Sequence, residues 1–186
     1  MIRSLALAPL LAALAAQAQN AADFAVEASV EGRRVEVRAR AALDAPVALV
    51  WQVISDYERL PQFIPGISRS VVLARSGEHV LVEQSGEARF LVFSVPIEVR
   101  LEVLEWAPEW IASRAVAGNL RRMSGRYEIH PAPGHGVVLR YFGTIEPEFE
   151  LPPLVGAAIL RAMAEEQFAA MAREIRRRAG AGAIAR

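Results

Sequence analysis

Residues 152–178 read PPLVGAAILRAMAEEQFAAMAREIRRR and are predicted to form a single long helix. Its apolar side chains recur at steps of three and four, which places them on one helical face: Leu160, Ala164, Phe168, Met171 and Ile175. The two prolines separate this helix from the preceding chain, and the tail GAGAIAR is predicted to fray. Because an average helix has about 11 residues, one of this length is a main element of the fold.

The chain before this helix alternates apolar and polar residues, which is the period of half-buried strands. Short turns rich in glycine and proline separate the alternating segments, so neighbouring strands are expected to pair in antiparallel order. A helical spacing interrupts the series at residues 47–54, and a second short helical turn is predicted at 59–64. The predicted strands cover residues 24–31, 33–42, 67–75, 78–93, 95–106, 110–117, 120–130 and 137–151.

These elements predict an α+β fold in which a curved antiparallel sheet wraps around the long C-terminal helix. An antiparallel sheet with one apolar face must cover that face, and this helix is the long element that can do so. A sheet curled around one helix leaves space between its concave face and the short helices near residues 47–64. Side chains either fill that space or leave it as a cavity.

The first residues have the layout of a secretory signal peptide. Arg3 supplies the positive charge, LALAPLLAALAA supplies an apolar run, and AQA at 16–18 is a small-residue cleavage site. The run is shorter than the roughly 20 residues that span a bilayer. We therefore expect cleavage near Ala18, one domain over residues 19–186, and a periplasmic or secreted protein.

Composition excludes several classes of site. The formal net charge is zero, so no overall field favours nucleic acid. The chain has no cysteine, which removes disulfides, thiolate metal ligands and thiol nucleophiles. All 21 basic residues are arginine, so a lysine Schiff base is excluded as well. We expect no metal and no cofactor, because the three histidines lie at or beside predicted turns without helical metal spacing.

Three stretches resemble the polyketide cyclase/dehydrase and START-like lipid-transport (SRPBCC) superfamily, nearest its coenzyme-Q-binding branch. They are Trp51 with VISDYERLPQFIPGISRSVV, then VEQSGEARF, then GNLRRMSGRYEI. The resemblance covers residues 35 to 178 and implies a helix-grip (START/Bet v1-like) fold around an apolar cavity. Gly66 and Ile67 stand where quinone-binding members often carry an aromatic residue and a cysteine. Because the superfamily includes carriers, cyclases and receptors, the fold does not decide the function.

The predicted cavity lining consists of residues on the inward faces of the late strands, the long helix and the 59–66 loop. Ordinary core is the alternative for each of them. Gly86, Gly125 and Gly143 interrupt three strands, and glycine within a strand marks a bend or a close approach to the backbone. The predicted lining residues are Phe63, Ile64, Phe90, Val92, Arg114, Met123, Tyr127, Tyr141, Leu160, Ala164 and Phe168.

Two of these residues carry open alternatives. Phe63 and Ile64 lie between two prolines, and they either form the rim of the cavity or plug the core beneath the short helix. Arg114 shares a face with Trp110, so it either points inward to bind a ligand's carbonyl or carboxylate or extends outward past that ring.

The function predicted from these observations is binding or carriage of a hydrophobic small molecule, such as a lipid, an isoprenoid or a quinone, without chemistry. Burying about 300 Å² of such a molecule yields about 7 kcal/mol before association costs are subtracted. The alternatives are a cyclase or dehydrase that uses the same cavity, and an envelope-assembly factor without ligand. Arginines at 121–122 and 173–178 allow transient contact with an anionic membrane surface.

Overall fold

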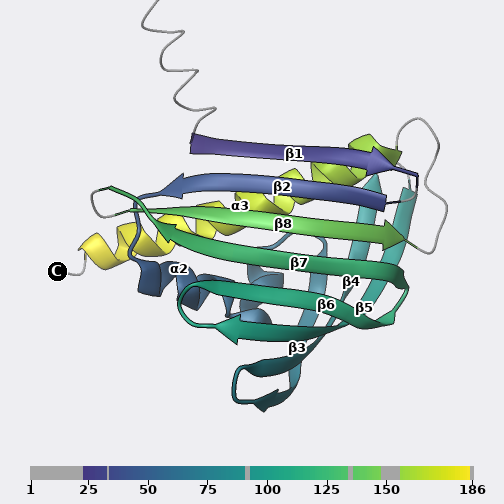
Figure 1. Ribbon diagram of the computed structural model, residues 1–186, viewed down its shortest axis with the longest axis horizontal. Helices are drawn as coiled ribbons and strands as arrows, with labels where there is room; N and C mark the ends of the chain where they lie inside the picture. The colour runs from purple at the N-terminus through teal and green to yellow at the C-terminus, as the bar shows by residue number, and fades with distance from the viewer. Residues whose placement is uncertain (1–22, 33, 91–92, 134–135, 148–155, 185–186) are drawn as a thin grey trace, which may run out of the picture.

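The computed structural model describes residues 23–32, 34–90, 93–133, 136–147 and 156–184. Eight strands form one antiparallel sheet in the order β1-β2-β8-β7-β6-β5-β4-β3 (Figure 1). The strands are β1 Phe24–Glu31, β2 Arg34–Leu43, β3 Ile67–Ser76, β4 His79–Phe90, β5 Phe93–Trp106, β6 Trp110–Gly118, β7 Leu120–Pro131 and β8 Val137–Pro147. The meander from β3 to β8 returns to the N-terminal hairpin, because β8 pairs with β2.

Alternation along the strands decides which face of the sheet is buried. In β2 every second residue from Val35 to Leu43 is buried, and in β5 the buried residues are Val99, Leu101 and Val103. This is the pattern of an antiparallel sheet with one covered face and one face toward water.

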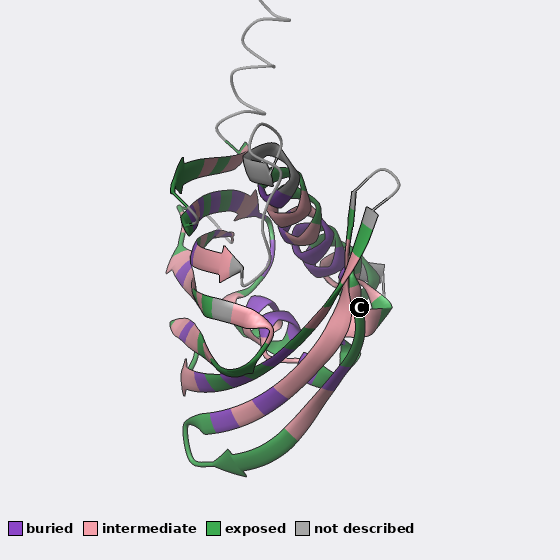
Figure 2. Cartoon of the chain, turned by 90° about the vertical axis from the view of Figure 1, so that its right-hand side faces the viewer, coloured by how far each residue is buried: buried purple, intermediate pink, exposed green. Residues whose placement is uncertain are grey.

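Three helical elements lie on the covered, concave face. They are α2 at Val47–Ile54, the 3₁₀ helix η1 at Tyr57–Gln62 and the long helix α3 at Gly156–Ile184. Figure 2 shows the sheet curving around the buried sides of the helices. Phe168 and Ile175 of α3 are buried against the sheet, together with Val50 and Val53 of α2.

The predicted fold class is confirmed, and the elements occur in the predicted order. Two boundaries differ from the prediction. The tail after Arg178 was expected to fray, but α3 continues to Ile184, since its alanines favour helix. β4 ends at Phe90 and β5 begins at Phe93, so this hairpin falls earlier than the predicted strand bounds placed it. The predicted strand residues 148–151 lie outside the described part of the chain.

Candidate functional site

The segment that joins α2 to β3 is held from both sides by polar contacts. The Arg178 guanidinium of α3 donates two hydrogen bonds of 3.1 Å to the Asp56 carboxylate. The Tyr57 hydroxyl donates to the Glu105 carboxylate of β5 at 2.8 Å. These anchors fix η1 across the concave face, between the long helix and the sheet.

At the end of this segment the backbone itself contacts the sheet. Gly66 has a φ of 82°, a conformation that favours glycine, and its carbonyl accepts a 2.9 Å hydrogen bond from the Glu87 amide. A Cβ on Gly86 would collide with the Gly66 carbonyl oxygen, so a side chain there is excluded. The predicted close approach at Gly86 is therefore a contact between two stretches of backbone.

An inner cavity of about 130 Å³ lies between the concave face and the helices. The sheet supplies its lining from β4 to β8: Val82, Gln84, Leu101, Val103, Ile111, Ser113, Met123, Tyr127 and Tyr141. The helices, the α2–β3 segment and the first residue of β3 supply the opposite side: Ile54, Tyr57, Leu60, Ile64, Ile67, Gln167 and Met171. Most of this lining is apolar, and its polar groups are hydroxyls and amides.

An outer hollow of about 460 Å³ adjoins the inner cavity and is more polar. Ile67 and Gln167 line both spaces, and the Gln167 side-chain amide donates a 3.1 Å hydrogen bond to the Pro65 carbonyl. This bond joins α3 to the 65–67 backbone where the two spaces meet. The outer lining comprises Pro65, Gly66, Ile67, Ser68, Glu87, Arg89, Met163, Glu166 and Gln167.

The two tyrosines of the inner cavity lie beside each other on paired strands. Tyr127 and Tyr141 are register partners of β7 and β8, and their ring centroids are 4.7 Å apart. The Tyr141 ring lies low against the sheet. Its hydroxyl oxygen is only 2.9 Å from the position that a Cβ on Gly125 would occupy. A Cβ on Gly143 would come within 2.5 Å of the same oxygen. These two glycines therefore make room for an aromatic ring. Here a side chain approaches the strand backbone closely, whereas at Gly86 another stretch of backbone does so.

Burial keeps both phenols neutral. It raises the pKa of Tyr141 to about 12 and raises that of Tyr127 further, with the neighbouring Tyr141 as a smaller cause. Their accessible surface faces the cavity that they line. At neutral pH each hydroxyl therefore remains a hydrogen-bond donor.

The structure brings four of the predicted lining residues together at the inner cavity: Ile64, Met123, Tyr127 and Tyr141. The helix residues Leu160 and Ala164 instead pack with the first strands, beside Val35 and Val37 of β2. Phe168 is buried, and its ring contacts Phe24 of β1 with centroids 5.7 Å apart. The Phe90 side chain and Val92 lie outside the described residues.

Of its two alternative positions, Phe63 does not take the one at the rim. It packs against the hydrophobic core, and the Arg178 guanidinium lies 5.7 Å from its ring centroid. The neighbouring Ile64 takes the cavity position, because the backbone after η1 turns the two side chains to different sides. The rim consists of Pro65, Gly66 and Ile67.

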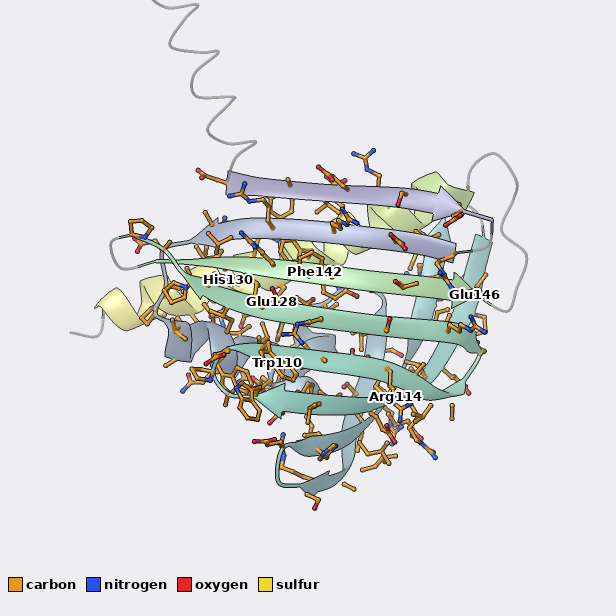
Figure 3. The ribbon with its side chains drawn as sticks, in the orientation of Figure 1. Trp110, Arg114, Glu128, His130, Phe142 and Glu146 are labelled. Atoms are coloured by element: carbon orange, nitrogen blue, oxygen red, sulfur yellow. The ribbon has the colours of Figure 1, made fainter. Side chains whose placement is uncertain are left out.

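Arg114 lies on the outer face of the sheet, so it takes the outward one of its two alternatives and does not line the cavity (Figure 3). Its Nε atom donates a 2.9 Å hydrogen bond to the Glu102 carboxylate, and the pair is exposed. The inward alternative rested on the strand face that Arg114 shares with Trp110. Trp110 instead stacks on Trp106 and lies under the Arg126 guanidinium, so the ring is covered without entering the core. The inward residues of β6 are Ile111 and Ser113.

Three of the helix residues that line the two spaces form a row, and of these the predicted apolar stripe contained Met171 alone. Met163, Gln167 and Met171 follow one another at steps of four, so they share one face of α3. Because Gln167 is polar, this row lacks the continuous apolar pattern of the adjacent row that holds Leu160, Ala164 and Phe168. In the sequence, a polar residue flanked by two methionines at helical spacing is the pattern that could have indicated this row of lining residues.

Three of the α3 arginines that could contact a membrane surface have partners within the protein. Arg177 and Arg178 bind the Glu174 carboxylate, and the Arg176 guanidinium donates to the Ala42 carbonyl at 3.2 Å. The Glu174 carboxyl is nearly buried, and its hydrogen bonds from Arg177 lower its pKa to about 2. In the described residues, no helix combines the length and apolar character needed to cross a membrane.

The comparisons with known proteins agree with this architecture. The Zhui aromatase/cyclase from Streptomyces sp. R1128 superimposes with a TM-score of 0.66 at 16% identity, over 79% of this chain and 94% of that chain. A STAR-related lipid transfer protein fragment from Xanthomonas axonopodis gives a TM-score of 0.64 at 16% identity, over 82% and 98%. A START superfamily protein from Mycobacterium smegmatis gives 0.62 at 18%, over 78% and 97%.

At these identities the structural likeness shows the fold alone. No curated protein sequence matches the chain. The family model described as "Polyketide cyclase / dehydrase and lipid transport" matches residues 43–172, which include η1, the strands from β3 to β8 and most of α3. This chain therefore belongs to the polyketide cyclase / dehydrase and lipid transport family.

Proposed function

We propose that this protein binds and carries a hydrophobic small molecule, such as a lipid, an isoprenoid or a quinone, without transforming it. The observation that carries the proposal is the apolar inner cavity adjoining the outer hollow, between the sheet and α3. The family includes lipid transport in its description, and one structural neighbour is a lipid transfer protein.

The sizes of the two spaces restrict the bound molecule. An engineered apolar cavity of about 150 Å³ holds benzene, so the inner cavity accepts about one ring or a short chain end. Such a ring buries about 150 Å² of apolar surface, worth about 4 kcal/mol. A micromolar complex needs about 8 kcal/mol, so the rest of the molecule must be bound in the outer hollow. Together the two spaces reach the range of about 300–1,000 Å³ that is usual for ligand sites.

The chemistry of the inner lining favours carriage over catalysis. General acid–base catalysis needs a group whose pKa lies near the working pH. Among the described lining residues of the inner cavity there is no carboxylate, histidine or arginine. The pKa values of Tyr127 and Tyr141 lie too far above neutrality for either phenol to act as a base. The open volume also argues against an assembly factor whose own side chains fill the cavity.

Export to the periplasm is part of the same proposal. Its support is the leader-like order of Arg3, an apolar run and the AQA step before residue 19. A carrier in the periplasm would meet lipids and isoprenoids released from the two envelope membranes.

The proposal is tested by native mass spectrometry of protein purified from a bacterial periplasm, followed by organic extraction. A stoichiometric adduct with the mass of a lipid, isoprenoid or quinone is expected. Bare protein that takes up none of these molecules when they are offered would refute carriage.

A cavity-filling variant tests whether the adduct occupies the inner cavity. Ile111→Phe places a ring in the inner lining, so uptake should fall at least tenfold, whereas overpacking costs only about 1–3 kcal/mol of stability. The matched control is Val116→Phe on the same strand, where the side chain is 44% exposed and uptake should be unchanged. Met123→Phe fills the same wall if Ile111→Phe does not fold. Equal uptake by all these folded proteins would place the ligand elsewhere.

A further inference from the structure

Three hydroxyl groups gather on one wall of the inner cavity. They belong to Ser113 of β6, Tyr127 of β7 and Tyr141 of β8. Ser113 is the register partner of Gly125, and the position of a Cβ on Gly125 lies 3.4 Å from the Ser113 oxygen and 2.9 Å from the Tyr141 oxygen. The two hydroxyls therefore converge above a glycine, beside the Tyr127 ring.

The two phenolic hydroxyls at this wall have no partner among the described residues, unlike the third tyrosine of the chain. The Tyr57 hydroxyl donates to Glu105, and the Ser113 hydroxyl donates a long hydrogen bond of 3.5 Å to the Gly125 carbonyl. No hydrogen bond joins the Tyr127 or Tyr141 hydroxyl to another described group. Among the same residues, no fully enclosed polar side-chain atom lacks a partner. The two phenolic oxygens therefore reach the open space of the cavity, where a bound molecule can satisfy them.

The surroundings decide what kind of group fits there. Because both phenols stay protonated, they present donors to the cavity. No cation among the described lining residues of the inner cavity is available to balance an ionised carboxylate, and burying an unbalanced charge is costly. A neutral acceptor oxygen is the group that such donors recognise.

We propose that Ser113, Tyr127 and Tyr141 form a subsite for a neutral carbonyl oxygen on a ring-sized head group, with the rest of the ligand leading past Ile67 and Gln167 into the outer hollow. This inference rests on the proposed function, because it names the part of the ligand that enters first. The cavity volume limits that part to about one ring.

Binding of matched probes tests the subsite. The probes are 2-hexyl-1,4-benzoquinone, 4-hexylcyclohexanone and hexylbenzene, which share a tail and a six-membered ring but differ in carbonyl oxygens. Titration calorimetry on the mature protein gives a Kd for each probe. The chain contains no cysteine and no lysine, so the quinone has no thiol or lysine amine to alkylate.

Tyr127→Phe and Tyr141→Phe remove the hydroxyls but keep the rings. Each should raise the Kd of both carbonyl probes about 3- to 10-fold, the effect of one net hydrogen bond, and leave the Kd of hexylbenzene unchanged or lower. Ser113→Ala should act in the same direction but more weakly. Its matched control is Ser124→Ala, which removes an exposed hydroxyl from β7 and should change no Kd.

The outcomes separate this inference from the proposed function. If a Tyr→Phe substitution changes the Kd of all three probes equally, the rings act by packing and the subsite is refuted while carriage stands. If the substitution raises the Kd of the quinone alone, the subsite recognises a quinone ring. If it raises the Kd of the cyclohexanone equally, the subsite recognises a carbonyl oxygen on either kind of ring. If wild type binds none of the probes, the inference and the proposed function fail together.

Discussion

At the scale of single residues, Tyr141 shows how the absence of side chains shapes the cavity. Its ring lies over Gly125 and Gly143, which are register partners on neighbouring strands. A strand position without a Cβ leaves a shallow depression, and here an aromatic ring occupies it. The ring thereby stays out of the space that a ligand would use.

Restoring a Cβ at this depression should close the inner cavity. In Gly143→Ala the new methyl group would lie 2.5 Å from the Tyr141 oxygen, so the ring must lift into the cavity. We expect ligand uptake to fall at least fivefold and the unfolding free energy to drop by about 1–2 kcal/mol, as measured by titration and urea unfolding. Gly180→Ala in α3 meets no neighbouring atom and should instead stabilise the protein by about 0.5–1 kcal/mol. Unchanged uptake by Gly143→Ala would show that the ring can move without narrowing the site.

At the scale of elements, one acidic residue links the end of α3 to the segment before β3. Glu174 has an 8% exposed fraction and binds Arg177 and Arg178, and Arg178 also binds Asp56. Because Arg178 lies over Phe63 as well, this network holds the helix end against η1. It therefore positions the η1 residues that line the inner cavity.

This network predicts a specific loss of stability in acid. The folded pKa of Glu174 is lowered to about 2, below its unfolded value, so its contribution is complete above the unfolded pKa and is lost as the pH falls toward 2. Between pH 6 and pH 3, Glu174→Gln should reduce the pH dependence of the unfolding free energy by about 1 kcal/mol, measured by urea unfolding. Glu165→Gln, on the exposed side of the same helix, is the control. Identical pH profiles for Glu174→Gln and wild type would contradict this role.

At the scale of the whole molecule, patterns repeated along the chain determined what could be predicted. Apolar and polar residues alternate along β5 and β7 over many positions, so a single exception does not change the interpretation. The meander and the helix that covers it could be predicted from this alternation. The cavity depends instead on individual side chains. The inward alternative for Arg114 rested on the strand face that it shares with Trp110, but contacts with Trp106 and Arg126 cover that ring on the outer face. Similarly, the polar Gln167 lies in the cavity row because its amide is bonded to the Pro65 carbonyl.

Export is a property of the whole chain and is tested by its mature mass. Expressed in a Gram-negative bacterium, the protein should appear in the periplasm and begin at Gln19, as shown by intact-mass measurement. Leu11→Arg interrupts the apolar run, so this variant should stay in the cytoplasm with its leader attached. A wild-type protein that keeps residues 1–18 after fractionation would exclude cleavage at the proposed step.

The two sides of the passage between the outer hollow and the inner cavity differ in stiffness. On one side the Gly66 and Gly86 backbones touch, and no rotation of a side chain can separate them. On the other side Met163 and Met171 are unbranched and can change rotamer, and methionine adapts readily to irregular shapes. Gln167 between them is held by its hydrogen bond to the Pro65 carbonyl. The width of the passage is therefore fixed on the side of the Gly66 and Gly86 backbones and adjustable on the side of α3. For the proposed carriage, this means that the width of the ligand is limited by the fixed backbone side and accommodated on the methionine side.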